Sequence, residues 1–180
     1  MPDLIKLSKF ISVVLRHNPE EFNIKLDEEG FTTLDALWQA IKGKYGNRYT
    51  TNNFQEVLQS PGGKQRFEVK HGRIRAMYGH SNVSVQYEGV TPPEILYHGT
   101  YPGAIAAIKR EGLTSQKRQF VHLSADIDRA ADVAHRRGKA IILVIRALDA
   151  HNAGLAFHHP EDKHYLVKSI PPEFIEFPEE

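Results

Sequence analysis

Arginine and histidine side chains occur at three places in the sequence where they could hold a phosphate group. Arg16 and His17 lie in the last turn of an expected helix that Pro19 should end. Arg66 falls in a segment of alternating polarity, and Arg118 falls in a basic loop. Arginine offers a planar fork of donors to phosphate oxygens, and a protonated histidine adds another donor. A phosphate clamp is therefore one interpretation of these residues.

Each of these residues also has an ordinary explanation. The macrodipole favours a cation pair such as Arg16 and His17 at a helix C-terminus. An exposed strand often carries an arginine beside a glutamate, as Arg66 and Glu68 would lie here, and a charge run such as residues 116–119 is usually solvated. For each residue taken alone, the ordinary explanation is favoured.

The segment His98-Gly99-Thr100 stands between an expected strand and an expected helix. Glycine allows the backbone to approach a ligand closely, and Thr100 could cap the helix or bond a ribose or a phosphate. The sequence contains neither a Walker pattern nor GxGxxG, so neither common nucleotide-binding loop is supported.

Ten histidines raise the question of a metal site, above all His158, His159 and His164. Their spacing matches no common ligand motif, there is no cysteine, and we expect solvated loop histidines and no metal. No nucleophile elbow or pair of catalytic carboxylates stands out either. The residues alone therefore do not choose a reaction.

Length and composition limit the class of protein. The 180 residues suit two small lobes, and a hydrophobic content of 41% suffices for a globular core. The net charge is only +1, so a polyanion would have to bind at local clusters of charge. The lack of cysteine, of a signal-peptide pattern and of an apolar run of membrane-spanning length leads us to expect a cytoplasmic protein with no membrane contact. We also expect a monomer.

The first 80 residues predict three helices. The first is capped by Asp3 and has apolar residues at helical spacing, namely Leu4, Leu7, Phe10, Ile11 and Val14. Thr32 or Thr33 would cap a second helix that runs to Ile41, followed by a polar loop over 42–49. Thr51 would open a third helix that Ser60-Pro61-Gly62-Gly63 stops.

A hairpin is expected next. Residues 64–69 and 73–77 alternate in polarity around a turn at His71-Gly72. Three short helices and a hairpin indicate a winged-helix-like lobe over residues 1–80. The segment 81–93 contains Gly89 and two prolines, which is typical of a linker.

Residues 94–180 predict a second lobe of mixed strands and helices. We expect strands over 95–97, 120–123 and 140–145, with short strands near Tyr165 and over 174–177. One helix should run from Pro102 to Glu111, ended by Gly112, and another should begin after a cap at Ser124 or Asp126. A loop should reach Asp162. Regular βαβ alternation is missing, so α+β is the expected fold class.

Five segments in order resemble the RNA 2′-phosphotransferase family, the tRNA 2′-phosphotransferases. They are LSKFISVVLRHNP (7–19), KQRFEV (64–69), IRAMYGHS (74–81), LYHGT (96–100) and VHLSAD (121–126). Each segment is weak alone, whereas all five in order are a strong signal. Where the family usually has Asn-Gly before an apolar residue and then Leu-Thr, this chain reads Asp-Lys at 162–163 and ends the segment with Val167.

The resemblance implies an N-terminal winged-helix lobe and a C-terminal ADP-ribosyltransferase-like NAD-binding lobe over 94–180. It also implies residue roles. The catalytic set would be Arg16, His17, Arg66 and Arg118. The residues that line the NAD⁺ site would be His98, Gly99, Thr100, His122 and Ser124.

The implied reaction removes an internal 2′-phosphate from RNA and consumes NAD⁺ without a metal. The phosphate would attack the nicotinamide ribose to give a 2′-phospho-ADP-ribosylated RNA. The ribose 2″-hydroxyl would then attack phosphorus, releasing 2′-OH RNA and ADP-ribose 1″,2″-cyclic phosphate. The partners implied are an RNA that carries a 2′-phosphate and NAD⁺.

Two other functions compete with this one. An NAD-dependent ADP-ribosyltransferase acting on protein or nucleic-acid ends would stop after the first step, and it would not need cations on the first lobe. A non-catalytic winged-helix nucleic-acid-binding protein should have a basic recognition helix. Residues 33–41 contain no arginine and only Asp35 as a charge, which argues against it.

Overall fold

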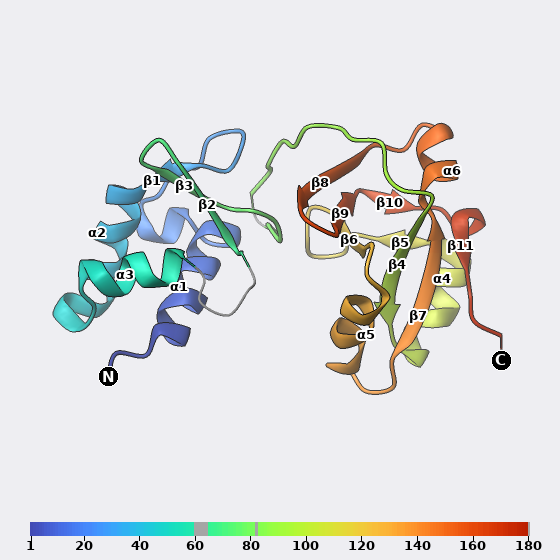
Figure 1. Cartoon of the computed structure of the whole chain (residues 1–180), viewed down its shortest axis with the longest axis horizontal. Helices are drawn as coiled ribbons and strands as arrows, with labels where there is room; N and C mark the ends of the chain where they lie inside the picture. Colours follow the sequence, from blue (N-terminus) through green and yellow to red (C-terminus); the bar gives the residue numbers. More distant parts are fainter. Residues whose placement is uncertain (60–64, 82, 180) are drawn as a thin grey trace. The chain divides into compact units, whose positions relative to one another are not determined.

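The chain folds into two compact units, each with helices and strands, which confirms the α+β class (Figure 1). A computed structural model describes residues 1–59, 65–81 and 83–179. Unit 1 is Met1–Gln86 and unit 2 is Tyr87–Glu180. Among the described residues, no helix is both long and apolar enough to cross a membrane.

Three α-helices supply most of the core of unit 1. α1 (Leu4–Arg16) begins at Asp3, whose carboxylate accepts from the Lys6 N–H as predicted, and it buries the apolar face that the spacing indicates. α2 (Leu34–Tyr45) begins after Thr33, whose hydroxyl accepts from the Ala36 N–H. α3 (Thr51–Leu58) has a capping box in which Thr50 and Asn53 satisfy each other's backbone N–H groups.

The predicted polar loop over 42–49 is wrong. α2 continues to Tyr45, and η2 (Gly46–Arg48) follows it directly. The rings of Tyr45 and Tyr49 pack edge to face at 5.2 Å, and Tyr45 meets Phe10 of α1 at the same distance. These contacts hold a segment whose polar composition suggests a loop. The predicted stop of α3 at 60–63 lies outside the described residues.

The predicted hairpin is confirmed. β2 (Phe67–Lys70) and β3 (Arg73–Ala76) pair antiparallel, and His71 and Gly72 both have positive φ, as a tight hairpin turn requires. β1 (Thr32–Thr33) adds a third strand, so that the order is β1-β3-β2. The sequence did not indicate β1, because two residues are too few to show an alternation.

The segment 81–93 divides between the two units. Val85 is buried against Gly30, and the Gln86 N–H donates to the Glu28 carbonyl at 2.7 Å. The Val90 N–H donates instead to Phe157 in unit 2 at 2.8 Å. The boundary between the units therefore falls inside this segment, between Gln86 and Tyr87.

Unit 2 contains a six-stranded antiparallel sheet in the order β11-β7-β4-β6-β9-β8 (Figure 1). Its strands, in chain order, are β4 (Ile95–Thr100), β6 (Val121–Ser124), β7 (Ile141–Arg146), β8 (Phe157–Glu161), β9 (His164–Val167) and β11 (Ile175–Glu176). A separate short pair joins β5 (Leu113–Thr114) to β10 (Ser169–Ile170).

The helices of unit 2 are α4 (Ile105–Glu111), α5 (Ile127–His135) and α6 (Ala147–Asn152), with η3 (Pro102–Ala104) ahead of α4 and η4 (Pro172–Phe174) ahead of β11. Gly112 ends α4 as predicted. Asp126, one of the two predicted caps, caps α5 through its side chain. Thr100 caps no helix, since η3 begins after Tyr101.

The predicted loop that ends at Asp162 is wrong, because α6 and β8 lie within it. His158 and His159 are therefore strand residues and not loop histidines. β8 contains Pro160, and a proline in a sequence normally argues against predicting a strand there. β8 is an edge strand with an irregular register around Pro160, and an edge tolerates the missing N–H.

Gly99 is required for the packing of α5 on β4. A Cβ at Gly99 would lie 2.0 Å from the Ala130 carbonyl oxygen and 2.9 Å from the Ala134 Cβ. The bare face of this glycine therefore meets a helix, and any substituent must displace α5.

We expect Gly99→Ala to lower the free energy of unfolding by roughly 3 kcal/mol, the upper part of the range for overpacking a core. Gly89→Ala is the matched control in unit 2, since among the described residues nothing lies within 4 Å of its added Cβ. Urea unfolding of both variants measures the difference. Equal stabilities would show that α5 moves aside at no cost.

Candidate functional site

The end of α1 presents Arg16 and His17 on unit 1. Arg16 is the last residue of the helix and His17 is its C-cap. The Ser81 N–H donates to the Arg16 carbonyl at 2.9 Å, and the Ser81 Oγ lies 2.6 Å from the His17 Nδ1. One serine therefore holds the backbone of the first residue and the ring of the second.

Residues 78 and 79 hold the Arg16 side chain. Its guanidinium lies over the Tyr78 ring, 5.3 Å from the centroid. Gly79 has a φ of +89°, and a Cβ there would lie 3.4 Å from the Arg16 Cδ. The segment Tyr78–Ser81 thus positions both predicted site residues. This segment belongs to the motif at residues 74–81 that resembles the family, but the sequence alone indicated no role for it.

Arg66 is exposed just before β2. Its carbonyl accepts from the Met77 N–H at 3.1 Å, which extends the hairpin by one step. Met77 directly precedes Tyr78, so the hairpin brings Arg66 to the segment that holds Arg16. We call Arg16, His17 and Arg66 the cation cluster of unit 1.

The ring of His80 is buried near the positive charges of this cluster. Only 2% of its surface is exposed. Burial and, after it, the positive charges of Arg16, His17 and Arg75 together lower the pKa of His80 to about 4. The neighbouring positive charges favour an anion near this ring, whereas burial disfavours a charge of either sign.

Unit 2 contains a pocket of about 520 Å³ where β4 and β6 separate. Within the described residues these strands share one register pair, Tyr97 with Ser124. Beyond it β4 stays paired with β7, and β6 stays paired with β9. The pocket is lined by residues of both strands, of α4 and α5, and of the loop before β6.

The charged residues that line this pocket are mostly cations. Lys117, Arg118, Arg129 and Arg137 face it, against Glu111 as the acidic residue among the lining side chains. Arg129 lies 3.4 Å from the Glu161 carboxylate, and the Arg137 guanidinium lies over the Tyr101 ring at 5.8 Å. The pocket therefore suits an anionic ligand.

His98 bridges the two strands of the pocket. Its Nδ1–H donates to the His122 carbonyl at 2.9 Å, because a carbonyl can only accept. Burial lowers the pKa of His98, and the bond to the carbonyl opposes this more weakly. His98 is therefore neutral near pH 7, with its Nε2 as an acceptor.

All five residues predicted to line a ligand site border this pocket: His98, Gly99, Thr100, His122 and Ser124. Arg118 borders it too, on a turn in which its N–H donates to the Ser115 carbonyl. The Ser124 hydroxyl donates to the Asp126 carbonyl and accepts from the Asp126 N–H, so it shapes the turn into α5.

His164 also borders the pocket, although the sequence suggested a solvated loop histidine. It is 8% exposed on β9, opposite Ser124 in the register. Its place depends on the pairing of β6 with β9, which no local pattern reveals. Among the described residues, no group of three His, Cys, Asp or Glu side chains could hold a metal ion.

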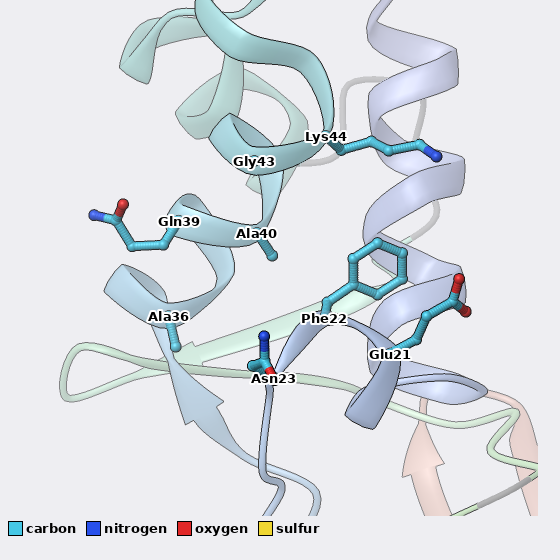
Figure 2. Close-up of a pocket in the computed structure, with 8 residues that line it drawn as sticks. All are labelled: Glu21, Phe22, Asn23, Ala36, Gln39, Ala40, Gly43 and Lys44. Carbon is cyan, nitrogen blue, oxygen red and sulfur yellow. The ribbon is translucent and has the colours of Figure 1, made fainter.

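A second hollow, of about 450 Å³, lies on unit 1 beside α2 and η1 (Glu20–Phe22). Figure 2 draws its lining, which is Glu21, Phe22, Asn23, Ala36, Gln39, Ala40, Gly43 and Lys44. One acidic and one basic side chain leave it without the excess of cations seen in the unit 2 pocket. It includes no residue of the cation cluster.

Fold and site together define an α+β protein with a cation cluster on one unit and, in the other, a pocket whose charged lining residues are mainly cationic. The chain belongs to the RNA 2′-phosphotransferase, Tpt1/KptA family, whose profile matches residues 2–169. Proteins named probable RNA 2′-phosphotransferase are similar over nearly their whole length. The protein of Acetivibrio thermocellus is 38% identical, with 97% of each chain covered.

Two other proteins with the same name are similar to this chain to the same degree. The protein of Pectobacterium atrosepticum is 39% identical over 94% of this chain and 96% of its own. That of Fusobacterium nucleatum is 38% identical over 98% of this chain and 100% of its own. The family predicted from five short segments is therefore confirmed.

The lowered pKa of His80 predicts acid sensitivity in unit 1. Above pH 6.5, His80 is neutral in the folded and the unfolded chain and adds no pH dependence. Between pH 6.5 and about 4, the unfolded chain binds a proton that the folded protein excludes, so stability falls as the pH falls. By pH 4 the loss should reach about 3 kcal/mol.

His80→Gln, which cannot titrate, should remove this part of the pH dependence. Urea unfolding at pH 7 and pH 4.5 measures it in both proteins. A variant that loses as much stability on acidification as the wild type would show that other groups cause the sensitivity.

Proposed function

We propose that the protein removes an internal 2′-phosphate from RNA by transferring it to NAD⁺. The products are 2′-OH RNA, nicotinamide and ADP-ribose 1″,2″-cyclic phosphate, formed through a 2′-phospho-ADP-ribosylated RNA. The observation that carries the proposal is the pocket of unit 2, which gathers the five residues assigned to NAD⁺ and lies among cations. Unit 1 serves as the winged-helix-like RNA lobe, and unit 2 serves as the ADP-ribosyltransferase-like NAD lobe.

The unit 2 pocket fits a dinucleotide in size and in chemistry. Its volume of about 520 Å³ is in the usual range for small-ligand sites. A diphosphate carries two negative charges, and Arg118, Arg137 and Lys117 offer charge-assisted donors to it. Thr100 and the neutral His98 supply neutral polar groups for ribose hydroxyls. NAD⁺ is consumed as a substrate.

The cation cluster of unit 1 fits the phosphate of the RNA. A helix C-terminus carries about half a negative charge, which alone would repel a phosphate. Arg16 and His17 add up to two positive charges there, and Arg66 lies opposite Met77, next to the segment that holds Arg16. The side chains therefore outweigh the helix. We assign Arg16, His17, Arg66 and Arg118 to the catalytic set.

The first step forms a bond from a phosphate oxygen to the ribose carbon that carries nicotinamide, and the carbon–nitrogen bond breaks. The electron pair goes to the cationic ring, so nicotinamide leaves as a neutral molecule and needs no general acid. This step depends mainly on the position of the phosphate. Arg16, held over Tyr78 and against Gly79, provides a fixed donor for that purpose.

In the second step the ribose 2″-hydroxyl attacks phosphorus and loses its proton, and the bond from phosphorus to the RNA 2′-oxygen breaks. That oxygen takes up a proton and leaves as the RNA 2′-hydroxyl, so no net proton is gained or lost. Negative charge spreads over the remaining phosphate oxygens, and guanidinium groups can stabilise it as a metal would. His17 either holds the phosphate as a cation or protonates the departing 2′-oxygen. The bond from Ser81 to the His17 Nδ1 leaves Nε2 as the nitrogen for either role.

NAD⁺ should suffice for the reaction. We expect an oligonucleotide with one internal 2′-phosphate to lose it in the presence of NAD⁺ and excess EDTA, with release of nicotinamide and the cyclic phosphate. Gel electrophoresis and mass spectrometry measure the products. A 3′-phosphorylated oligonucleotide is the control and should not react.

Three results would contradict the proposal. Activity that EDTA abolishes and Mg²⁺ restores would mean that a metal takes the role assigned to the arginines. Release of inorganic phosphate without NAD⁺ would indicate a phosphatase. A stable ADP-ribosylated product without the cyclic phosphate would favour an ADP-ribosyltransferase that stops after the first step.

A further inference from the structure

Two histidines share one hydrogen bond at the wall of the unit 2 pocket. The His122 Nδ1 lies 2.9 Å from the His164 Nε2, and the two rings meet edge to face at 81°. Both residues line the pocket. The mechanism above uses His122 as a residue of the NAD⁺ site but gives His164 no role.

The register of the sheet creates this contact. β6 and β9 pair antiparallel, with Ser124 opposite His164 and His122 opposite Leu166. His122 and His164 are therefore diagonal neighbours on one face of the sheet, a separation that two imidazole rings can bridge. His164 is 8% exposed, so its ring is held by its surroundings.

His122 is restrained at its backbone as well. The His122 carbonyl accepts the Nδ1–H of His98 at 2.9 Å. The side chain of His164 and the side chain of His98 thus hold the ring and the backbone of the same residue, from β9 and β4 respectively. This arrangement resembles the outer contacts that orient a binding residue in other sites.

A hydrogen bond between two imidazole nitrogens contains one proton. If His122 donates from Nδ1, its neutral ring offers Nε2 as an acceptor; if His164 donates, the neutral His122 ring offers an Nε2–H donor. The nitrogen of His122 outside this bond is Nε2 in both cases. His164 therefore decides both the rotation of the His122 ring and the nitrogen it presents.

We propose that His164 is a positioning residue of the NAD⁺ pocket, acting through its hydrogen bond to His122. This inference rests on the proposed function, because it takes NAD⁺ as the ligand of the pocket. His164 contacts His122 and fixes how that residue meets NAD⁺. The loss of its hydrogen bond should weaken NAD⁺ binding even where the fold survives.

A double-mutant cycle tests the proposal on the full-length protein, with NAD⁺ binding measured by calorimetry. His164→Phe should weaken NAD⁺ binding about tenfold, the effect of losing one hydrogen bond in a buried site. His122→Phe should weaken it at least as much. The double variant should bind like His122→Phe alone, because His164 has no route to the ligand once His122 is gone.

His164→Gln keeps a group that can bond the His122 Nδ1 and should recover most of the affinity. It also serves as the readable variant if His164→Phe fails to fold, which thermal unfolding would show. His159→Gln is the matched control. His159 is an exposed histidine on β8 that stacks on Tyr165 outside the pocket lining, and its loss should leave NAD⁺ affinity unchanged.

The proposal would be overturned if the losses of NAD⁺ affinity caused by the two Phe substitutions multiplied in the double variant. It would also be overturned if His164→Phe bound NAD⁺ with full affinity. A His164→Gln protein as weak as His164→Phe would also overturn it, since the hydrogen bond would then not matter. If the wild-type protein binds no NAD⁺, the proposed function fails and this inference fails with it. If the wild-type protein binds NAD⁺ but the effects of the two Phe substitutions multiply, the inference about His164 fails and the proposed function stands.

Discussion

Positive charge in this protein is concentrated in a few places, although the net charge of the chain is only +1. Arg16 and His17 stand at the one end of a helix where the backbone itself is negative. Burial and, after it, the positive charges of Arg16, His17 and Arg75 lower the pKa of the nearby His80. The segment Tyr78–Ser81 maintains this arrangement through a ring beneath Arg16 and a serine on His17. Charge confined in this way suits a single phosphate better than a long polyanion.

In unit 2 the pocket lies where two neighbouring strands of the sheet separate. β4 and β6 part after a single pair of residues, and side chains take over the contacts that a continuous ladder would make. The bond from His98 to the His122 carbonyl spans the opening, and Gly99 lets α5 press against β4 at its edge. Rigid strands thus present the polar groups of the pocket, and the cations lie around them.

The sequence predicted those features that local patterns encode. The apolar spacing and Asp3 defined α1, and His71-Gly72 defined the hairpin, because both signals lie within a few residues. Long-range contacts decided the rest. Tyr45 packs against Phe10 and Tyr49 packs against Tyr45. Pro160 is tolerated because β8 lies at an edge, and His164 reaches His122 only through the register of β6 and β9. The assignment of Arg16, His17 and Arg66 came from resemblance, because each has an ordinary explanation when it is taken alone.

We propose that the arginines stabilise the negative charge that develops at phosphorus in the second step, in addition to binding the substrate. A single-turnover time course with Arg16→Ala, resolved on a gel, tests it most directly. We predict that ADP-ribosylated RNA accumulates, because attack at carbon needs mainly position whereas attack at phosphorus redistributes charge. The second step should slow by roughly 100-fold or more, and Arg16→Lys should recover little because an ammonium lacks the planar fork. Equal slowing of both steps, with no intermediate at any time, would contradict the account and leave these arginines a role in binding alone.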